Sequence, residues 1–391
     1  MSEKKFVYAD HAATTAVTES VMKAMEPYFR DNWGNPSSLH TPGRKAAAAV
    51  RDAKKTIADT LNCRETEIYF TSGGTEAINW ALKGNARANR HRGRHIVSTE
   101  IEHHAVLNSI AALKSERYEA TLVKPCCGDG LICPDEFERA VRPDTIQMIC
   151  MLANNEIGTI EPVKELARIA HRHKADFFCD AVQAMGNIPI DLDRLGVDML
   201  SISGHKIGAP KGIGLLYIKT GCMVSRYIDG GAQERGQRAG TENVAYIVGL
   251  AQAIKDAASA SKDKAGLKQK RDRLASELHK IPFSQINGTM EQRLAGNLNM
   301  SFEFCESESL LLLLDLAGIC VSAGSACTAA KDEPSHVLKA IGLPEKTIRS
   351  SIRFSLGDEN TDDDIEYIIS QMHKITAQIR ALSPEYGKLT S

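Results

Sequence analysis

The sequence predicts an α/β protein with a mostly parallel β-sheet flanked by helices and a smaller α+β domain. Two observations lead to this prediction. From residue 67 onward, short β-rich runs alternate with helical stretches, which is typical of a parallel sheet covered on both faces. Near residue 250 the pattern changes to a long charged helical stretch, followed by shorter strands and helices. We expect a large domain over residues 15–255 and a small domain formed by residues 1–14 and 256–391.

The composition is that of an ordinary globular protein. Of the 391 residues, 43% are hydrophobic and 25% are charged, and the formal net charge is −1. Without a charge excess, we expect no binding to nucleic acid or to an anionic membrane surface. The longest apolar run, residues 309–319, is too short to cross a bilayer, and the N-terminus carries no apolar signal region. Together with ten cysteines in no regular spacing, these features predict a cytoplasmic protein with free thiols.

The elements of the predicted large domain follow one another in a regular order. A polar loop and a turn-rich segment come before an alanine-rich helix around residues 44–61. A second helix is expected over residues 163–173, beginning after Pro162. The β-rich runs that form the sheet lie at residues 67–71, 95–99, 146–152, 176–179 and 198–203. Because ligands of such sheets bind at the carboxyl ends of the strands, the loops after these runs are the candidate sites.

The predicted small domain starts with a charged helix. Residues 253–280 carry three leucines along one stripe, which predicts a single long helix that bridges the two domains. Short strands are expected after it, at residues 297–303, 319–322 and 351–356. Thr361 is followed by three aspartates, which is typical of a capping box at the start of the last helix.

The segment between residues 198 and 219 carries the first candidate for chemistry. Two apolar runs flank a loop rich in Gly and Pro, which predicts two strands joined by an irregular turn. Lys206 lies in this turn, with Ser203 and His205 beside it. Partial burial of its amine would lower its pKa and make it a better nucleophile, as a Schiff-base lysine requires. Taken alone, the pattern also fits a surface lysine in a hairpin loop.

The sequence Ser-Gly-Gly-Thr at residues 72–75 stands between a predicted strand and a predicted helix. Glycines let a ligand approach the backbone closely, and the first N–H groups of a helix are unpaired. An anion such as a phosphate is therefore expected at Gly74 and Thr75. The alternative is a Gly-rich turn with nothing bound.

Two polar residues follow strand ends further along the chain. His103 comes after the strand at residues 95–99 and could stack on an aromatic cofactor or move protons. Asn155 comes after the most apolar strand and could donate a hydrogen bond to a phenolate or carboxylate oxygen. A polar loop histidine and ordinary turn chemistry would explain the same residues.

Asp180 stands at the end of the predicted strand over residues 176–179. Such a carboxylate could keep a pyridine nitrogen protonated, which makes the ring an electron sink. Gln183, three residues further on, could reach the oxygen of such a ring. The alternative role of Asp180 is that of a helix N-cap.

The C-terminal part contributes a thiol and a guanidinium. Cys327 lies in a small, polar segment that we expect to be an exposed loop, where a thiol of lowered pKa acts as a nucleophile. The alternative interpretation is that Cys327 is an inert thiol in a loop. Arg353 is a charge inside an otherwise apolar strand, and it fits either a bidentate clamp for a carboxylate or a salt-bridged structural arginine.

Taken together, these segments resemble the cysteine desulfurases of the NifS/IscS type, in the class V branch of the fold-type I enzymes that use pyridoxal phosphate (PLP). The resemblance covers nearly the whole chain and implies the fold of the PLP-dependent transferases. The Gly-Ser-Ala-Cys sequence, on a long loop, resembles the group that serves iron–sulfur assembly. The matching motifs occur in family order at Thr71–Glu76, Asn154–Gly158, Asp180 with Gln183, Ser203–Lys206, Arg238–Thr241, Gly324–Thr328 and Ser351–Ser355.

The resemblance implies a role for each candidate residue that binds the cofactor. Lys206 would form the Schiff base with PLP, Asp180 would pair with the pyridine nitrogen, and His103 would stack on the ring as a catalytic residue. Gln183 and Asn155 would hold the phenolic oxygen and the substrate. The phosphate would be bound by Gly74, Thr75, Ser203 and His205, with Thr241 reaching in from the partner subunit of a homodimer.

The resemblance also implies a reaction. Arg353 would bind the carboxylate of L-cysteine, and Cys327 would take the sulfur as a persulfide while the substrate becomes L-alanine. The sulfur would pass to an iron–sulfur scaffold protein or another acceptor, and Cys327 could also be a transient ligand of an iron–sulfur cluster. Two departures from the family pattern, at Asp10–Ala13 and at Ala323, leave the subfamily open.

Other functions remain compatible with the same residues. A selenocysteine lyase or a class V aminotransferase would share the PLP site, and an aminotransferase would not need Cys327. A non-catalytic binding or redox-sensing module on this fold would lack a Schiff base at Lys206.

Overall fold

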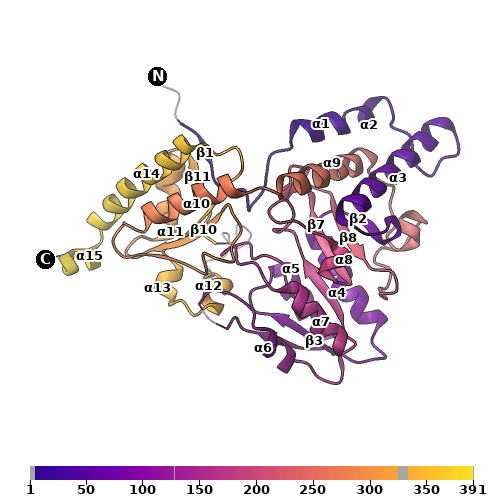
Figure 1. Ribbon diagram of the computed structural model, residues 1–391, viewed down its shortest axis with the longest axis horizontal. Helices are drawn as coiled ribbons and strands as arrows, with labels where there is room; N and C mark the ends of the chain where they lie inside the picture. The colour runs from indigo at the N-terminus through magenta and orange to yellow at the C-terminus, as the bar shows by residue number, and fades with distance from the viewer. Residues whose placement is uncertain (1–4, 127, 325–332, 391) are drawn as a thin grey trace.

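The computed structural model describes residues 5–126, 128–324 and 333–390, so the predicted sulfur acceptor Cys327 lies outside the described residues. A larger and a smaller part lie side by side, and both ends of the chain belong to the smaller part (Figure 1). Within the described residues, no helix is both long enough and apolar enough to cross a membrane.

A seven-stranded sheet forms the centre of the larger part. Neighbouring strands in this sheet run parallel except at β8, which is antiparallel to both β2 and β7. The mostly parallel sheet predicted from the sequence is therefore confirmed, although the prediction omitted the polar edge strand β4. In spatial order the strands are β2 (Ile68–Thr71), β8 (Gly214–Ile218), β7 (Met199–Ser203), β6 (Asp176–Asp180), β5 (Thr145–Ile149), β3 (His95–Thr99) and β4 (Glu119–Val123).

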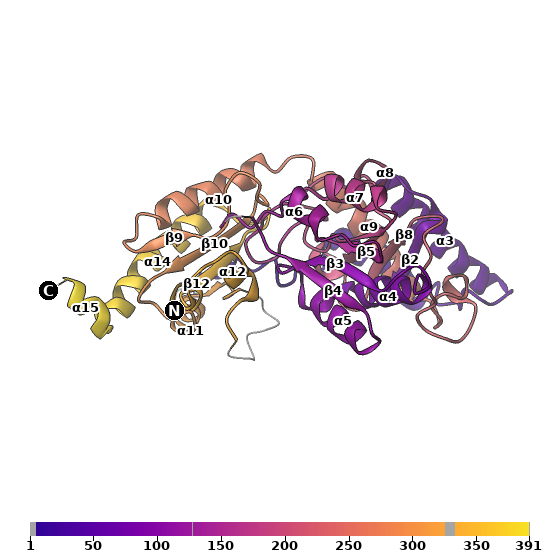
Figure 2. The same cartoon turned by 90° about the horizontal axis from the view of Figure 1, so that it is seen from below.

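Helices cover both faces of this sheet, because successive strand residues are apolar and point to opposite sides. In β6, Phe178 belongs to the buried cluster of α4 (Gly74–Ala88) and α5 (His104–Ser115). Its neighbour Phe177 belongs to the cluster on the opposite face, which is formed with α3 (Thr41–Leu61), α7 (Val163–Arg172) and α9 (Val244–Ala260). Figure 2 shows α4 and α5 on one side of the strands and α7 on the other.

Shorter elements complete the larger part. Helices α1 and α2 pack along α9, and α6 packs against α7. Single turns of 3₁₀ helix lie at Glu65–Glu67 and Gly204–Lys206. The segment Gln233–Gly236 is an irregular turn, in which Glu234 and Arg235 have positive φ values. The short α-helices are α1 (Glu19–Met25), α2 (Pro27–Arg30), α6 (Pro134–Arg139) and α8 (Leu192–Leu195).

The smaller part is an α+β unit with its own core. Three antiparallel strands pair in the order β12 (Ser351–Ser355), β10 (Asn297–Phe302) and β9 (Ser284–Ile286). Near the N-terminus, β1 (Val7–Tyr8) pairs in parallel with β11 (Ile319–Cys320). The helices of this part are α10 (Ala265–Leu278), α11 (Ser307–Leu316), α12 (His336–Ala340), α13 (Glu345–Ile348), α14 (Asp362–Ala381) and α15 (Pro384–Thr390).

Buried apolar side chains of the smaller part form a cluster separate from those around the central sheet. Leu274, Phe302 and Ile368 from three C-terminal elements belong to it, and so does Val7 near the N-terminus. Domain boundaries at residues 15 and 255 stay a prediction.

Two expectations about helices need correction. The single helix over residues 253–280 is wrong, because the chain leaves helical geometry between α9 and α10. Around the break, Ser261 donates to the carbonyl of Ala258, and Asp263 accepts from the backbone N–H of Ala265. Such local side-chain bonds compete with helix bonds, and the two helices pack in different cores. The capping box at Thr361 is confirmed, but its helix α14 is followed by α15.

Candidate active site

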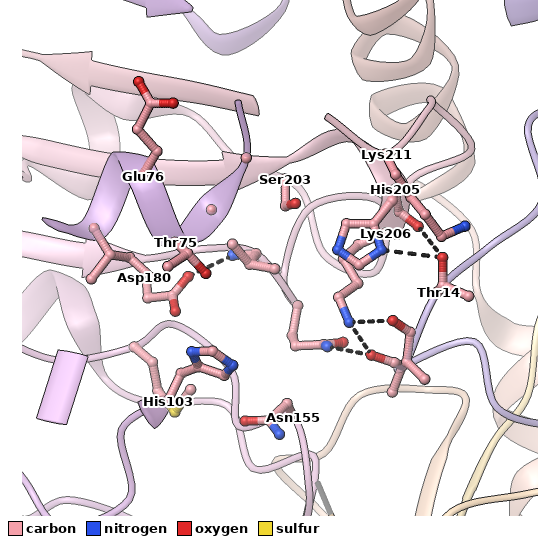
Figure 3. A pocket seen from close by; sticks show the side chains of 18 of the residues that line it. Thr14, Thr75, Glu76, His103, Asn155, Asp180, Ser203, His205, Lys206 and Lys211 are labelled. Atoms are coloured by element: carbon pink, nitrogen blue, oxygen red, sulfur yellow. Dashed lines mark hydrogen bonds between the residues drawn. The ribbon is translucent and has the colours of Figure 1, made fainter. Parts of the chain in front are cut away.

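A cavity of about 600 Å³ opens at the carboxyl ends of the parallel strands (Figure 3). Its volume is within the usual range for cofactor and substrate sites. Thr241 lies outside this cavity, in a surface hollow that also contains Phe29 and Trp33. The predicted site residues that line the cavity are Gly74, Thr75, His103, Asn155, Asp180, Gln183, Ser203, His205, Lys206 and Arg353.

Five strand ends bring these side chains together, although they are far apart in the sequence. The turn with Gly74 follows β2, His103 follows β3, and Asn155 follows β5. Asp180 is the last residue of β6, and Lys206 lies three residues after the end of β7. Because these five strands run in the same direction, their ends meet at one edge of the sheet.

Lys206 is held by the N-terminal segment of the chain. The turn Gly204–Lys206 places its half-buried side chain in the cavity, where Nζ donates to the carbonyl oxygens of Ala12 (2.5 Å) and Ala13 (2.7 Å). Gln183 Nε2 donates to the same Ala12 carbonyl at 2.9 Å. The amine is thus oriented by backbone acceptors that approach from a segment almost two hundred residues away.

His205 is a neutral group on the wall of the cavity. Its Nδ1 lies 3.1 Å from the hydroxyl of Thr14 (Figure 3). Burial, followed by the nearby charges of Lys206 and Lys211, lowers the pKa of His205 to about 4. Near neutral pH this ring can donate or accept a hydrogen bond but carries no charge.

The turn at residues 72–75 has the geometry of an anion cradle. Gly73 adopts a φ of +154° and is the N-cap of α4. Because α4 begins just after the carboxyl end of β2, the first N–H groups of this helix lie at the cavity end of the sheet. A Cβ at Gly74 would come within 2.9 Å of Val182 and 3.4 Å of Ser203, so the site has no room for a side chain there. Glu76 pairs with Arg238 at 2.8 Å, so its negative charge is compensated.

Asp180 is a buried carboxyl at the floor of the cavity. Its Oδ1 accepts from the backbone N–H of Val182 and from the hydroxyl of Ser201, both at 3.0 Å. Burial raises its pKa above the ordinary value for aspartate. A turn rather than a helix follows it, so Asp180 is not a helix N-cap. A cationic ring nitrogen beside this carboxyl would favour its charged form.

His103 is fixed by the start of α5. Its Nδ1 accepts from the backbone N–H of Ala105 at 3.0 Å, so the proton of the neutral ring resides on Nε2. Burial lowers the pKa of His103 further toward the neutral form. The ring faces the same space as Asp180 and Asn155 (Figure 3).

Arg353 reaches the cavity from the smaller part of the molecule. Its side chain is buried, Nη1 donates to the carbonyl of Asn155 at 3.0 Å, and Nη2 contacts the carboxylate of Asp10 at 2.8 Å. The Nε atom is buried, and none of the described residues offers it a hydrogen-bond partner. Arg353 lines the cavity, and Nη1 and Nη2 each carry a second hydrogen that these contacts do not use.

The residues present fit pyridoxal phosphate. The glycine cradle with no room for a Cβ suits the phosphate, the buried acid suits the pyridine nitrogen, and the amine suits an aldehyde. The imidazole ring that lines the same space suits a face of the pyridine. This sheet and this donor set define a PLP-dependent enzyme of fold type I.

Comparison with known proteins identifies the family. The profile of the class-V aminotransferases matches residues 7–368. The chain therefore belongs to the class-V aminotransferase family, whose members use PLP, and the predicted family and cofactor are confirmed.

Several similar proteins carry the name cysteine desulfurase IscS. The one from Methanosarcina thermophila is 48% identical over 384 residues, which are 98% of this chain and 95% of the relative. The one from Dictyoglomus turgidum is 45% identical over 383 residues, 97% of either chain. Among solved structures, a NifS-like protein superposes with a TM-score of 0.90 at 36% identity, over 96% of this chain and 100% of its own. A structure of SspA in complex with cysteine superposes with a TM-score of 0.80 at 35% identity, over 90% of this chain and 98% of its own.

Sequence reasoning missed several residues that shape the cavity. The carbonyls of Ala12 and Ala13 orient Lys206, Ser201 holds Asp180, and Asp10 contacts Arg353. Backbone acceptors leave no signal in a single sequence, because any residue type supplies them. Asp10 had a visible signal, a carboxylate in a polar loop after a short strand, but its partner lies 343 residues away.

Proposed function

We propose that this protein is a cysteine desulfurase that converts L-cysteine to L-alanine and places the sulfur on Cys327. The observation that carries the proposal is the meeting of an amine, a buried acid and an arginine in one cavity: Lys206, Asp180 and Arg353. The relatives named cysteine desulfurase, at 45–48% identity over the whole chain, agree with this activity.

Binding of the cofactor is assigned to the strand-end residues. Lys206 would attach PLP covalently, Asp180 would hold the ring nitrogen, and His103 would cover the ring. The phosphate would lie at Gly74, Thr75, Ser203 and His205, and Gln183 would hold the phenolic oxygen. When bound, PLP supplies the sink for the electrons released at the substrate Cα.

Binding of the substrate is assigned to two residues that contact each other. Arg353 would bind the carboxylate through donors not used by Asn155 and Asp10, and the Asn155 side chain would orient the substrate. The Lys206 amine, which Ala12 and Ala13 hold in the cavity, would take the proton from the substrate Cα.

Sulfur transfer is assigned to Cys327. Its thiolate would attack the sulfur of the bound cysteine, the bond between that sulfur and Cβ would break, and the electron pair would return to the carbon skeleton. L-cysteine and the Cys327 thiol thereby give L-alanine and a Cys327 persulfide, with no outside oxidant or reductant. Delivery of this sulfur to an iron–sulfur scaffold protein, and a cytoplasmic location, are part of the same proposal.

A homodimer is also part of the proposal. Phe29, Trp33 and Leu39 are exposed by 54%, 73% and 89%, and two of them share the surface hollow of Thr241. Apolar side chains gathered on one surface favour contact with another protein surface. Contact between two copies there would let Thr241 reach the phosphate in the partner, as the family resemblance implies.

The proposal is tested by measuring L-alanine released from L-cysteine in the presence of a thiol reductant. We expect the native protein to release alanine and Cys327→Ser to lose about 100-fold in rate, because the nucleophile is missing. Lys206→Ala should lose the activity and the covalent attachment of PLP, which borohydride reduction and mass spectrometry detect. Cys126→Ser, which removes an exposed thiol elsewhere, is the matched control and should retain the native rate.

Equal alanine release from the native protein and Cys327→Ser would place the nucleophile elsewhere. No alanine from a native protein that is yellow with bound PLP would favour an aminotransferase instead.

A further inference from the structure

We propose that Asp10 is a positioning residue, which fixes the guanidinium of Arg353 in the orientation that receives the carboxylate of an amino-acid substrate. This inference rests on the proposed role of Arg353 and adds a residue from the opposite end of the chain.

The two side chains form a largely buried ion pair. Asp10 Oδ1 lies 2.8 Å from Arg353 Nη2, and their side chains are exposed by only 16% and 2%. Removing one member of such a pair leaves an uncompensated charge, so the arginine would lose its fixed position. Asp10 is the side-chain anion that the described residues place in contact with this guanidinium.

The remaining contacts leave donors for a ligand. Arg353 has five N–H donors, and its described hydrogen bonds go to Asp10 through Nη2 and to the Asn155 carbonyl through Nη1. These two anchors lie on different nitrogens, so together they fix both the position and the rotation of the guanidinium plane. The second hydrogens on Nη1 and Nη2 are not used by these two contacts and stay available to a ligand, since Arg353 lines the cavity.

Asp10 is itself rigidly held. It forms a parallel β-bridge with Ser355, two residues from Arg353 on β12. Its carbonyl accepts from the backbone N–H of Ala13 at 2.9 Å and from the Tyr8 hydroxyl at 3.2 Å. A short carboxylate side chain on a backbone held in this way can serve as a reference point for a long, flexible arginine side chain.

The same segment also contacts Lys206 through the carbonyls of Ala12 and Ala13. An experiment must therefore distinguish an effect of Asp10 on Arg353 from an effect on Lys206. If Asp10 acted only by shaping the segment around Lys206, its loss would weaken every amine ligand alike. If it positions Arg353, the loss affects only ligands that carry a carboxylate. Two ligands that differ in this one group distinguish the roles.

The experiment titrates the PLP-loaded protein with L-alanine and with ethylamine and follows the absorbance of the cofactor. For Asp10→Ala we expect L-alanine to bind about tenfold more weakly, as for loss of a hydrogen bond to a charged group. The affinity for ethylamine should change by less than about twofold, since ethylamine lacks the carboxylate. Asp10→Asn should recover most of the loss, because its amide oxygen can still accept from Nη2. The KM for L-cysteine should follow the L-alanine result, while kcat changes less.

Glu366→Ala is the matched control, since it removes a carboxylate that pairs with Arg273 on the exposed surface of the same part. The proposal is overturned if Asp10→Ala leaves L-alanine affinity unaltered or weakens both ligands equally. Asp10→Ser, whose side chain is too short to reach Arg353, gives the same comparison if the alanine variant does not fold. Because the titration measures amino-acid binding and not sulfur release, it stays decisive even if the protein catalyses a different PLP reaction.

Discussion

At the scale of single residues, burial favours the neutral form of ionisable groups in and beside the cavity, such as His103, His205 and Glu102. Glu102 directly precedes His103 and has no role in the proposed reaction. Its Oε1 accepts from Thr99 at 2.8 Å and from the backbone N–H of Met151 at 2.9 Å, whereas Oε2 is buried and finds no partner in the described part of the chain. Burial raises the pKa of Glu102 to about 8, so the protonated form is favoured near neutral pH.

This burial makes stability depend on pH in a definite direction. In the unfolded chain Glu102 titrates near its ordinary value of about 4.3. Between that value and about 8 the folded state binds more protons, so stability falls as pH rises. As the pH rises over this range, the free energy of unfolding should fall less for Glu102→Gln than for the native protein. The difference between the two proteins is at most about 1.4 kcal/mol per pH unit. Thermal unfolding across the range measures this difference.

Glu291→Gln, a substitution at an exposed glutamate, is the control and should follow the native pH dependence. Parallel curves for the native protein and Glu102→Gln would contradict a protonated, buried Glu102.

At the scale of elements, β8 approaches the turn at residues 72–75, the proposed phosphate site, without a side chain between them. Gly214 opens β8 and pairs with Thr71 on one side and Ser203 on the other. A Cβ on Gly214 would lie 2.6 Å from the Cα of Gly73. Only glycine lets β8 come this close to the turn that precedes α4.

Gly214→Ala should therefore displace the turn at residues 72–75. We expect a loss of about 1–3 kcal/mol in stability from overpacking and at least about tenfold weaker PLP binding. Titration of the PLP-free protein with PLP measures the affinity, and thermal unfolding measures the stability. Gly266→Ala is the control: a Cβ there meets nothing within 4 Å, so this helix should gain about 0.5–1 kcal/mol. Unchanged PLP affinity in Gly214→Ala would refute this role of the close approach.

Elements that neighbouring residues determine could be predicted from the sequence, whereas elements that depend on distant packing could not. The strand at residues 95–99 could be located from its β-branched residues Ile96, Val97 and Thr99, which favour a strand. The capping box of α14 was visible in four consecutive residues. The break between α9 and α10 was not, since it depends on which core each helix joins. The edge strand β4 was missed because a half-exposed strand lacks a continuous apolar run.

At the scale of the whole molecule, the N-terminal segment joins the two parts at the cavity. Residues 12 and 13 hold Lys206 of the larger part, and Asp10 holds Arg353 of the smaller part. Contacts that span 194 and 343 residues leave no pattern in a single sequence. The strand-end residues could be predicted because the topology of a parallel sheet gathers them, whereas this segment had to be found in the structure.

The proposed homodimer gives a prediction at the same scale. We expect the native protein to sediment as a dimer and Trp33→Glu to sediment as a monomer, because a charge would be placed in an apolar interface. The monomer should bind PLP about tenfold more weakly, since it lacks Thr241 of the partner. Sedimentation velocity and PLP titration measure the two effects.

Leu382→Glu is the control, because Leu382 is 80% exposed on the smaller part, away from this surface. A native protein that sediments as a monomer, or a Trp33→Glu variant that stays dimeric, would contradict the assigned interface.

The central claim is that sulfur moves from L-cysteine to Cys327, and the position of that sulfur tests it most directly. The PLP-loaded protein is mixed with one equivalent of L-cysteine without reductant, alkylated, digested and analysed by mass spectrometry. We predict one additional sulfur atom on the peptide that contains Cys327, in an amount that matches the L-alanine formed. Alanine formed with the sulfur on another cysteine, or with free sulfide and an unmodified Cys327, would contradict the claim.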